Sequence, residues 1–288
     1  MKFLKVFSFV FLVLLVVSSP MLNLGFAKTK PTEKDINKYL QKAGYPEEVI
    51  AILEQPQKEY IYEGKLVYSF HKSSNGNLKE KDDKSNLEVQ SGDVSTQSLS
   101  NWTQTLVASR FSTPSGPGKI EFNLDYNWTW NYDPYFTLMD KFGITWSGGF
   151  LAYPESAVYS YRAYGQHVSS TAVTYREYST GMKYNYTDYI SSAGIGFEYD
   201  IIKSFVQSNT VYGVYKHKGW GRVKIYTHSD NSGTYEGAAA AAAYFHKELN
   251  FTGELQYGTP PSITISPSIA FDKSNDVGEV FDFYNYRY

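Results

Sequence analysis

The sequence predicts an all-β main domain, either an antiparallel β-sandwich or a barrel-like sheet, preceded by a short helical pair and a disordered linker. From Trp102 onward, short runs of strand-forming residues alternate with turns that contain Gly and Ser, and no amphipathic helix is evident. One run, Ile120–Tyr132, alternates strictly between apolar and polar residues. The 288-residue chain has no cysteine, so it must form an ordinary hydrophobic core without disulfides.

The first 27 residues have the three parts of a secretory signal peptide. Lys2 and Lys5 form a basic head, and Phe7–Val17 is an apolar stretch. Gly25 and Ala27 then supply the small residues of a cleavage site. We therefore expect a secreted, extracellular protein cleaved near Ala27, with an uncleaved membrane anchor as the alternative. Loss of the two lysines moves the formal net charge from −2 to −4.

The next segment is predicted to be helical and then extended. Thr32–Gln55 has the apolar spacing of two short helices, the second of which is opened by Pro46 and stopped by Pro56. Two short strand-like runs follow, Glu59–Tyr62 and Leu66–His71.

The stretch DINKYLQKAGYPEEVIAILEQPQKEYIYEGKL, from Asp35 to Leu66, resembles a segment of uncharacterised secreted proteins of Gram-positive bacteria. In those proteins a short helical pair follows the signal peptide and precedes an unrelated domain. The resemblance implies a secreted setting and no particular activity, and it does not extend to the main domain.

Composition divides the rest of the chain. Residues 73–101 are polar, rich in Ser, Asn, Lys and Asp, and without an apolar period, which predicts a disordered linker. Cleavage within this linker would make the helical and hairpin segment, residues 28–72, a propeptide. Residues 102–288 form the predicted all-β domain, in which tyrosine is abundant.

The alternating run raises the question of where its rings lie. Successive side chains of a strand point to opposite faces, so all the apolar residues of the run share one face. We expect this face to be a buried core and the polar face, with Asp125, Asn127 and Asp133, to be solvated. If the strand outruns its core, Trp130 and Tyr132 would be exposed, and the polar face would offer oxygen ligands to calcium or a sugar. The apolar positions are Ile120, Phe122, Leu124, Tyr126, Trp128, Trp130 and Tyr132.

Six consecutive alanines, Ala238–Ala243, have two interpretations. Alanine favours helix. The flanking residues are strand-like, however, and a strand of small residues would let bulky rings or another backbone approach closely. We favour the strand.

The sequence contains no G-x-S-x-G, H-E-x-x-H, G-x-G-x-x-G or P-loop motif. The nearest approach to an enzyme signature is Glu198 with Asp200, which would share a strand face as in some β-sandwich glycanases. Retaining glycosidases need two such carboxylates about 5 Å apart across the sugar. Ile202 stands where a third carboxylate would be expected, which weakens the case for catalysis.

A possible calcium loop spaces oxygen side chains at Asp272, Ser274 and Asp276. A plain solvated loop is the favoured interpretation, so no cofactor is expected apart from this calcium alternative.

The most distinctive candidate for binding is a basic turn. Trp220 lies between two glycines, which predicts a position at a hairpin tip. Lys216, Lys218 and Arg222 surround it in an otherwise acidic chain. Cations beside an amphipathic ring suit an anionic membrane surface or wall polymer. The alternative is that Trp220 folds back over the end of the sandwich.

These observations favour a secreted, non-catalytic protein that binds a cell-surface or extracellular polymer such as a glycan. A membrane-active or pore-forming β protein is the first alternative, because long alternating strands can also enter membranes. A glycan hydrolase is the second. Nucleic acid is not an expected partner, because no strongly basic domain is present to neutralise phosphates.

Overall fold

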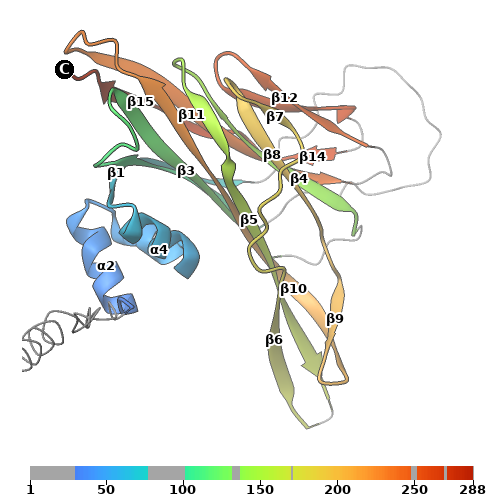
Figure 1. Cartoon of the computed structure of the whole chain (residues 1–288). Helices are drawn as coiled ribbons and strands as arrows, with labels where there is room; N and C mark the ends of the chain where they lie inside the picture. The colour runs from blue at the N-terminus through green and yellow to red at the C-terminus, as the bar shows by residue number, and fades with distance from the viewer. Residues whose placement is uncertain are drawn as a thin grey trace, which may run out of the picture. The chain divides into compact units, whose positions relative to one another are not determined.

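The computed structural model describes residues 30–76, 101–131, 137–169, 171–247, 252–268 and 271–287. Residues Glu33–Tyr288 make up one compact unit, and the description below concerns this unit. It consists mostly of antiparallel β-sheets, with three short helices near its beginning, and the sheets are not closed into a barrel (Figure 1). The predicted all-β class is therefore confirmed, in its sandwich-like form.

The larger sheet contains seven strands. Their spatial order is β1-β2-β3-β10-β5-β6, and β9 pairs with the first four residues of β10. The longest strands, β10 and β5, pair with each other through most of their length, with two bulges. The strands are β1 (Leu66–Gly76), β2 (Trp102–Phe111), β3 (Lys119–Trp130), β5 (Leu151–Val168), β6 (Val173–Ser179), β9 (Ser204–Gln207) and β10 (Thr210–His228).

The second sheet has six strands in the order β14-β11-β4-β8-β7, with β15 also pairing with β11. A separate hairpin, β12–β13, packs against one face of this sheet through a small apolar cluster that includes Phe245 and Leu255. The strands are β4 (Met139–Trp146), β7 (Tyr189–Ile190), β8 (Gly194–Asp200), β11 (Tyr235–Lys247), β12 (Glu254–Gly258), β13 (Ser262–Ser266), β14 (Phe271–Lys273) and β15 (Val277–Tyr284).

The core between the two sheets is aromatic. Trp128 of β3 stacks on Trp102 of β2 at 5.2 Å between ring centroids and on Tyr199 of β8 at 5.7 Å. Such ring pairs add to the large apolar area that each ring buries. Trp130 is also fully buried, so the described part of the alternating run does not outrun the core. Tyr132 and Asp133 lie outside the described residues.

The alanine run lies in strand β11, as favoured from the sequence. Ala238, Ala240 and Ala242 face the aromatic core, and Ala243 belongs to the cluster on the β12–β13 side. Small side chains are needed here because neighbouring backbone comes very close. A Cβ added at Gly148 would lie 2.8 Å from the Cβ of Ala238, and one at Gly278 would lie 2.7 Å from the Cβ of Ala241.

The N-terminal segment folds into three helices, α2 (Glu33–Lys42), α3 (Glu47–Ile52) and α4 (Gln55–Glu63). The predicted first two helices are present. The predicted stop at Pro56 is wrong: the second helix already ends at Ile52. Pro56 lies in the first turn of the next helix, α4, where proline is tolerated. The predicted strand Glu59–Tyr62 is consequently helical.

Strand β1 includes Leu66–His71 as predicted and continues to Gly76, through residues that the sequence placed in the linker. It pairs with β2 along its length. The predicted signal peptide and the remainder of the predicted linker, residues 77–100, lie outside the described residues.

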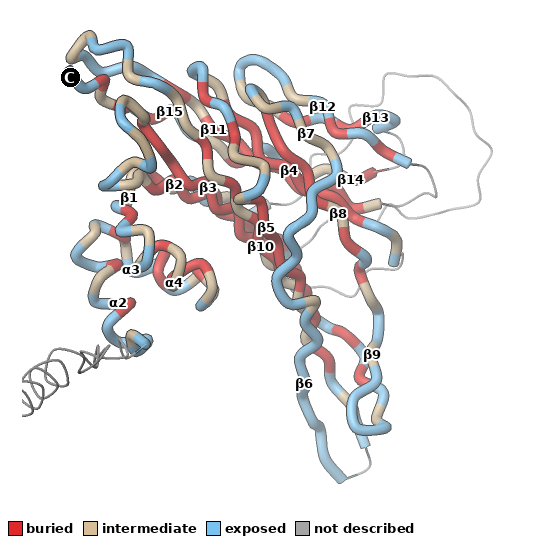
Figure 2. The backbone as a smooth tube through the Cα atoms, in the orientation of Figure 1, coloured by how far each residue is buried: buried red, intermediate tan, exposed pale blue. Residues whose placement is uncertain are grey.

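The helices cover one face of the larger sheet, and this overturns one expectation. Asp125 and Asn127 of β3 were expected to be solvated, yet they are 0% and 4% exposed. The cause lies in the helical segment: Gln57 of α4 donates a hydrogen bond from Nε2 to Asp125 Oδ1 at 2.9 Å. Strand β3 is therefore buried on both faces, by aromatic rings on one side and by polar contacts with helices on the other (Figure 2).

Candidate functional site

The predicted basic turn is not a turn. Residues 219–221 lie in the middle of β10, which pairs with β3 on one side and β5 on the other, and Trp220 is only 1% exposed. The flanking glycines make room for rings of the core. A Cβ at Gly219 would lie 2.5 Å from the Trp128 ring, and one at Gly221 would lie 2.4 Å from the Phe142 ring. The predicted exposure of Trp220 is therefore wrong.

The basic residues around Trp220 each have an aromatic or acidic neighbour. Lys218 forms an ion pair with Glu54, which directly precedes α4. The guanidinium of Arg222 lies 3.6 Å from the ring centroid of Tyr60 in α4. The ammonium group of Lys216 lies 5.3 Å from the Tyr164 ring centroid.

The polar layer under α4 centres on Asp125. Its carboxylate accepts hydrogen bonds from Gln57 and Asn123, and Arg222 is close enough to favour its charged form. Burial outweighs these partners and raises the pKa of Asp125 from 3.8 to about 6. Around it, the amide of Asn127 and two guanidinium nitrogens of Arg222 are buried without a hydrogen-bond partner.

A cleft opens in this layer between α3 and the sheet. It has a volume of about 110 Å³. Asn127 and Lys218 contribute to its wall. The remaining lining residues are Ala51, Ile52, Thr103, Gln104, Thr105, Trp128 and Thr129.

The predicted acidic pair, Glu198 and Asp200, lies on β8. Lys141, itself only 5% exposed, is 3.6 Å from Glu198 Oε2 and 3.0 Å from Asp188 Oδ2. Glu198 thus helps to neutralise a nearly buried ammonium group. Asp200 is exposed at the end of the strand. Neither position singles out a catalytic cleft.

The predicted calcium ligands are used in other ways. Ser274 is buried, and its hydroxyl accepts a hydrogen bond from the backbone N–H of Tyr244 at 2.9 Å. Asp276 forms an ion pair with Lys273 at 2.7 Å, and Asp272 is half-buried in β14. In the described ranges, no three His, Cys, Asp or Glu residues are grouped so that they could hold a metal ion.

A buried titratable cluster, which sequence reasoning missed, lies between the sheets. Asp140 accepts hydrogen bonds from the Tyr244 hydroxyl and from the backbone N–H of Lys247, and the Nδ1 atom of His246 lies 3.0 Å from its Oδ2. Nearby, the Tyr161 hydroxyl lies 2.8 Å from Nδ1 of His217.

Burial lowers the pKa of His217 to about 3, so its imidazole is neutral at physiological pH. His217, His246 and Asp140 are each at most 1% exposed. An Asp–His pair without solvent access has no place for a substrate, so we interpret the cluster as structural.

The most distinctive exposed surface is an extension of the larger sheet, which we call the arm. It comprises β6, β9, residues 163–168 of β5 and residues 210–216 of β10, and it projects beyond the second sheet and the helices (Figure 1). Every residue of β6 is exposed (Figure 2).

Four valines form a row at the tip of the arm. Val168 pairs with Val173, and Val206 pairs with Val211, so each pair shares a face of the sheet. His167 Nδ1 lies 3.1 Å from the carbonyl oxygen of Val211, which places the two pairs side by side. The four side chains are between 48% and 70% exposed.

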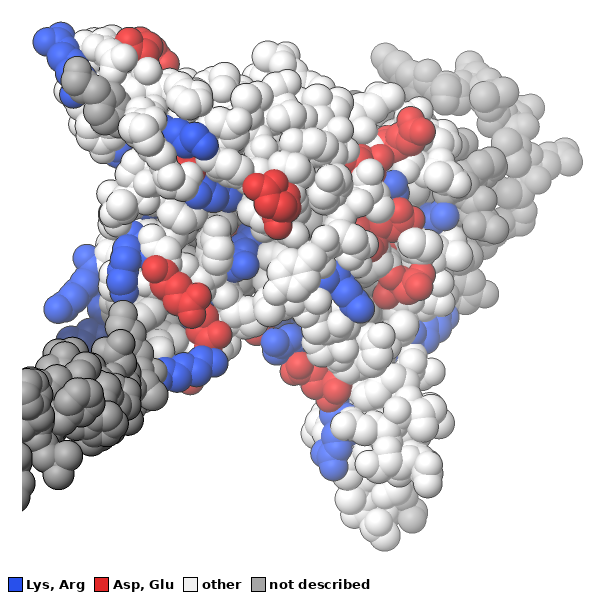
Figure 3. Space-filling model, viewed as in Figure 1, with Lys and Arg blue, Asp and Glu red and all other residues white. Residues whose placement is uncertain are grey.

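Tyrosines and a lysine follow the valines on the same face. Tyr175 and Tyr215 lie with ring centroids 6.0 Å apart, and Tyr164 pairs with Lys216 one level farther from the tip. The arm contains only three charged residues, Arg176, Glu177 and Lys216, and the corresponding surface is largely uncharged (Figure 3). The sequence places Val173 and Tyr175 two residues apart and thus on one face of a strand, but no feature of the sequence indicates that this face is uncovered.

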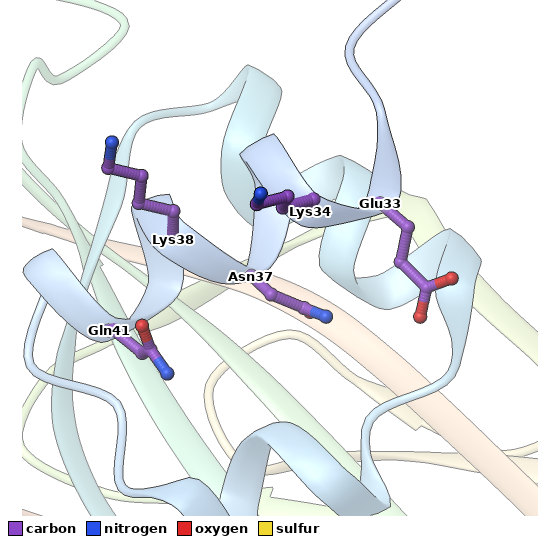
Figure 4. Close-up of a pocket in the computed structure, with 5 residues that line it drawn as sticks. All are labelled: Glu33, Lys34, Asn37, Lys38 and Gln41. Atoms are coloured by element: carbon purple, nitrogen blue, oxygen red, sulfur yellow. The ribbon is translucent and has the colours of Figure 1, made fainter.

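Helix α2 carries a hollow whose lining, among the described residues, comes from that helix (Figure 4). The lining residues are Glu33, Lys34, Asn37, Lys38 and Gln41. Most of these residues are exposed. Side chains on one side of a single helix do not point toward a common position where a ligand could bind. We assign no role to it.

Comparison with known proteins gives no assignment: no protein-family model matches the chain, and no curated protein does. Within the described ranges, no helix is long and apolar enough to cross a membrane. The functional argument therefore depends on the chemistry of the surfaces described above.

Proposed function

We propose that this protein is a secreted, non-catalytic binding protein that attaches to an anionic membrane surface through the tip of its arm. The observation that carries the proposal is the row of four exposed valines, Val168, Val173, Val206 and Val211. Clustered exposed apolar residues are a typical feature of surfaces that contact a protein partner or a membrane.

The order of residues along the arm favours a membrane over a protein partner. A strand rises about 3.4 Å per residue, so Arg176 lies about 10 Å along β6 from Val173. Interfacial segments bury their apolar side about 5–10 Å into the boundary between headgroups and acyl chains. At that depth the valines reach the acyl chains and Tyr175 lies among the headgroups, while Arg176, on the opposite face of β6, lies at the level of the lipid phosphates.

The arm is suited to shallow insertion. Its edge strands, β6 and β9, have 7 and 4 residues, whereas a membrane-spanning strand needs about nine to eleven. Backbone groups along the outer edges of β6 and β9 would also lose their water in hydrocarbon. We therefore favour attachment to one leaflet over the pore-forming alternative.

Vesicle flotation tests this proposal directly. We expect the full secreted chain to float with vesicles that contain phosphatidylglycerol, to float less with pure phosphatidylcholine, and to bind more weakly as salt is raised. Encapsulated dye should be retained. Failure to float with either vesicle would sink the proposal, and dye release would replace it with membrane permeabilisation.

A further inference from the structure

The carboxylate of Glu54 lies between two cations of the larger sheet. It forms ion pairs with Lys218 of β10 and with Arg162 of β5, whose NH1 lies 3.3 Å from Oε2. Lys218 and Arg162 are register partners, so their side chains leave the same face of the sheet. The Glu54 side chain is only 12% exposed. Two converging cations around a largely enclosed carboxylate form an oxyanion site.

Glu54, which occupies this site, belongs to the helical segment. The two sides of this segment contact the larger sheet in different ways. On the β1–β2 side the helices pack through an apolar cluster that includes Leu66 and Val107. Over β3 and β10 the contacts described above are mainly polar, such as the hydrogen bond between Gln57 and Asp125. Apolar burial is lost when helices separate from a sheet, whereas a polar contact can be replaced by one with water or a ligand. The side that carries Glu54 is thus the more readily released.

A ligand would find further partners beside the carboxylate. The cleft of about 110 Å³ under α3 is bordered by Lys218 and by Asn127. Asn127 is 4% exposed, and both its amide nitrogen and its amide oxygen lack a hydrogen-bond partner. Thr103 and Thr129, which are register partners, add two hydroxyl groups. An amide with a free donor and a free acceptor suits a hydroxyl group, which can serve as both.

We propose that Lys218 and Arg162 form a binding site for an oxyanion, a carboxylate or phosphate of an extracellular polymer, and that Glu54 occupies this site until the ligand displaces it. Hydroxyl groups next to the anion enter the cleft and bind Asn127. The site is separate from the valine row, so it does not depend on membrane attachment by the arm.

Neutralising Glu54 tests the proposal in the full chain. Glu54→Gln leaves Lys218 without its carboxylate and leaves Arg162 paired with Glu177 alone, at 3.2 Å, whereas Glu47→Gln, in α3 of the same helical segment, makes the same change of charge at an exposed position. Binding would be measured by affinity electrophoresis with inorganic polyphosphate and, in parallel, with poly-L-glutamate. We expect Glu54→Gln to bind at least one of them about tenfold more tightly than both the native chain and Glu47→Gln.

The polymer that gains affinity identifies the oxyanion. Adding Lys218→Gln to Glu54→Gln should abolish the gain. Equal affinities for the Glu54 and Glu47 variants would overturn the proposal, because they would indicate a general charge effect.

A second measurement covers the case in which Glu54→Gln does not fold. In the native chain, saturating polyphosphate or poly-L-glutamate should accelerate amide hydrogen exchange in α4, because the displaced carboxylate precedes this helix. Unchanged exchange in α4 with both polymers, at concentrations where they bind, would also overturn the proposal.

Discussion

The valine row makes a quantitative prediction about membrane attachment. Replacing Val168, Val173, Val206 and Val211 together by threonine keeps the branched shape and strand preference of each side chain but exchanges a methyl group for a hydroxyl group. Each exchange removes about 0.8 kcal/mol of apolar transfer free energy. Four exchanges cost about 3 kcal/mol, which corresponds to a roughly 200-fold weaker partition coefficient.

The assay is titration of anionic vesicles followed by flotation. Val280→Thr is the matched control, because Val280 is 66% exposed on β15, outside the arm. We expect the control to bind like the native chain. All variants should keep the native melting temperature, because the valine side chains are largely exposed and bury little apolar surface on folding. If the fourfold variant partitions within threefold of the native chain, the valine row does not enter the membrane.

Three further predictions concern the sheet and its cover. The folded state holds a proton on Asp125 below its pKa of about 6, whereas the unfolded chain releases it above 3.8, so this group adds stability as the pH falls from 7 to 4. In urea unfolding, Asp125→Asn should remove this rise in the free energy of unfolding between pH 7 and pH 4, which amounts to at most about 3 kcal/mol. An unchanged dependence on pH would contradict the raised pKa of Asp125. His217 has the opposite effect: its low pKa withdraws stability as the pH falls below 6.5, and its imidazole NMR signals should not titrate above pH 5. Gly221→Ala should destabilise the fold by about 1–3 kcal/mol in the same assay, because the new Cβ meets the Phe142 ring. Gly213→Ala, where the nearest atom is 3.9 Å away, should cost little, and equal losses would refute the close-approach argument.

Local patterns were sufficient to predict much of the sandwich. The alternation of Ile120–Tyr132 identified the inward face of β3, because a period of two has one structural meaning when one face is strongly apolar. The alanine run was resolved by its strand-like surroundings. Both inferences depended on neighbours in the sequence.

The errors arose where a distant segment determined the environment. The polar face of β3 has the sequence of a solvated face, and only the contact between Gln57 and Asp125 shows that helices cover it. Glycines on both sides of Trp220 resemble a turn in the sequence. In the structure they leave space for the rings of Trp128 and Phe142, which come from other strands. Periodicity assigns side chains to faces without indicating what covers each face.

The candidate site was missed for the same reason. The arm and the core have similar strand sequences, and they differ in whether a second layer lies over them. The basic residues Lys218 and Arg222 were identified as chemically distinctive, yet their sequence context did not reveal that Glu54 and Tyr60 lie against them.

The length of β10 has a mechanical consequence. One continuous strand pairs with β3 inside the sandwich and with β9 in the arm, while β5 accompanies it along both parts. A pull on a tethered tip along this direction would load many backbone hydrogen bonds of the β5–β10 ladder in shear at the same time, instead of opening them one after another. If the protein is attached by its tip in flowing liquid, the sheet should therefore remain folded under the load. The attachment to the surface should break before the sheet unfolds.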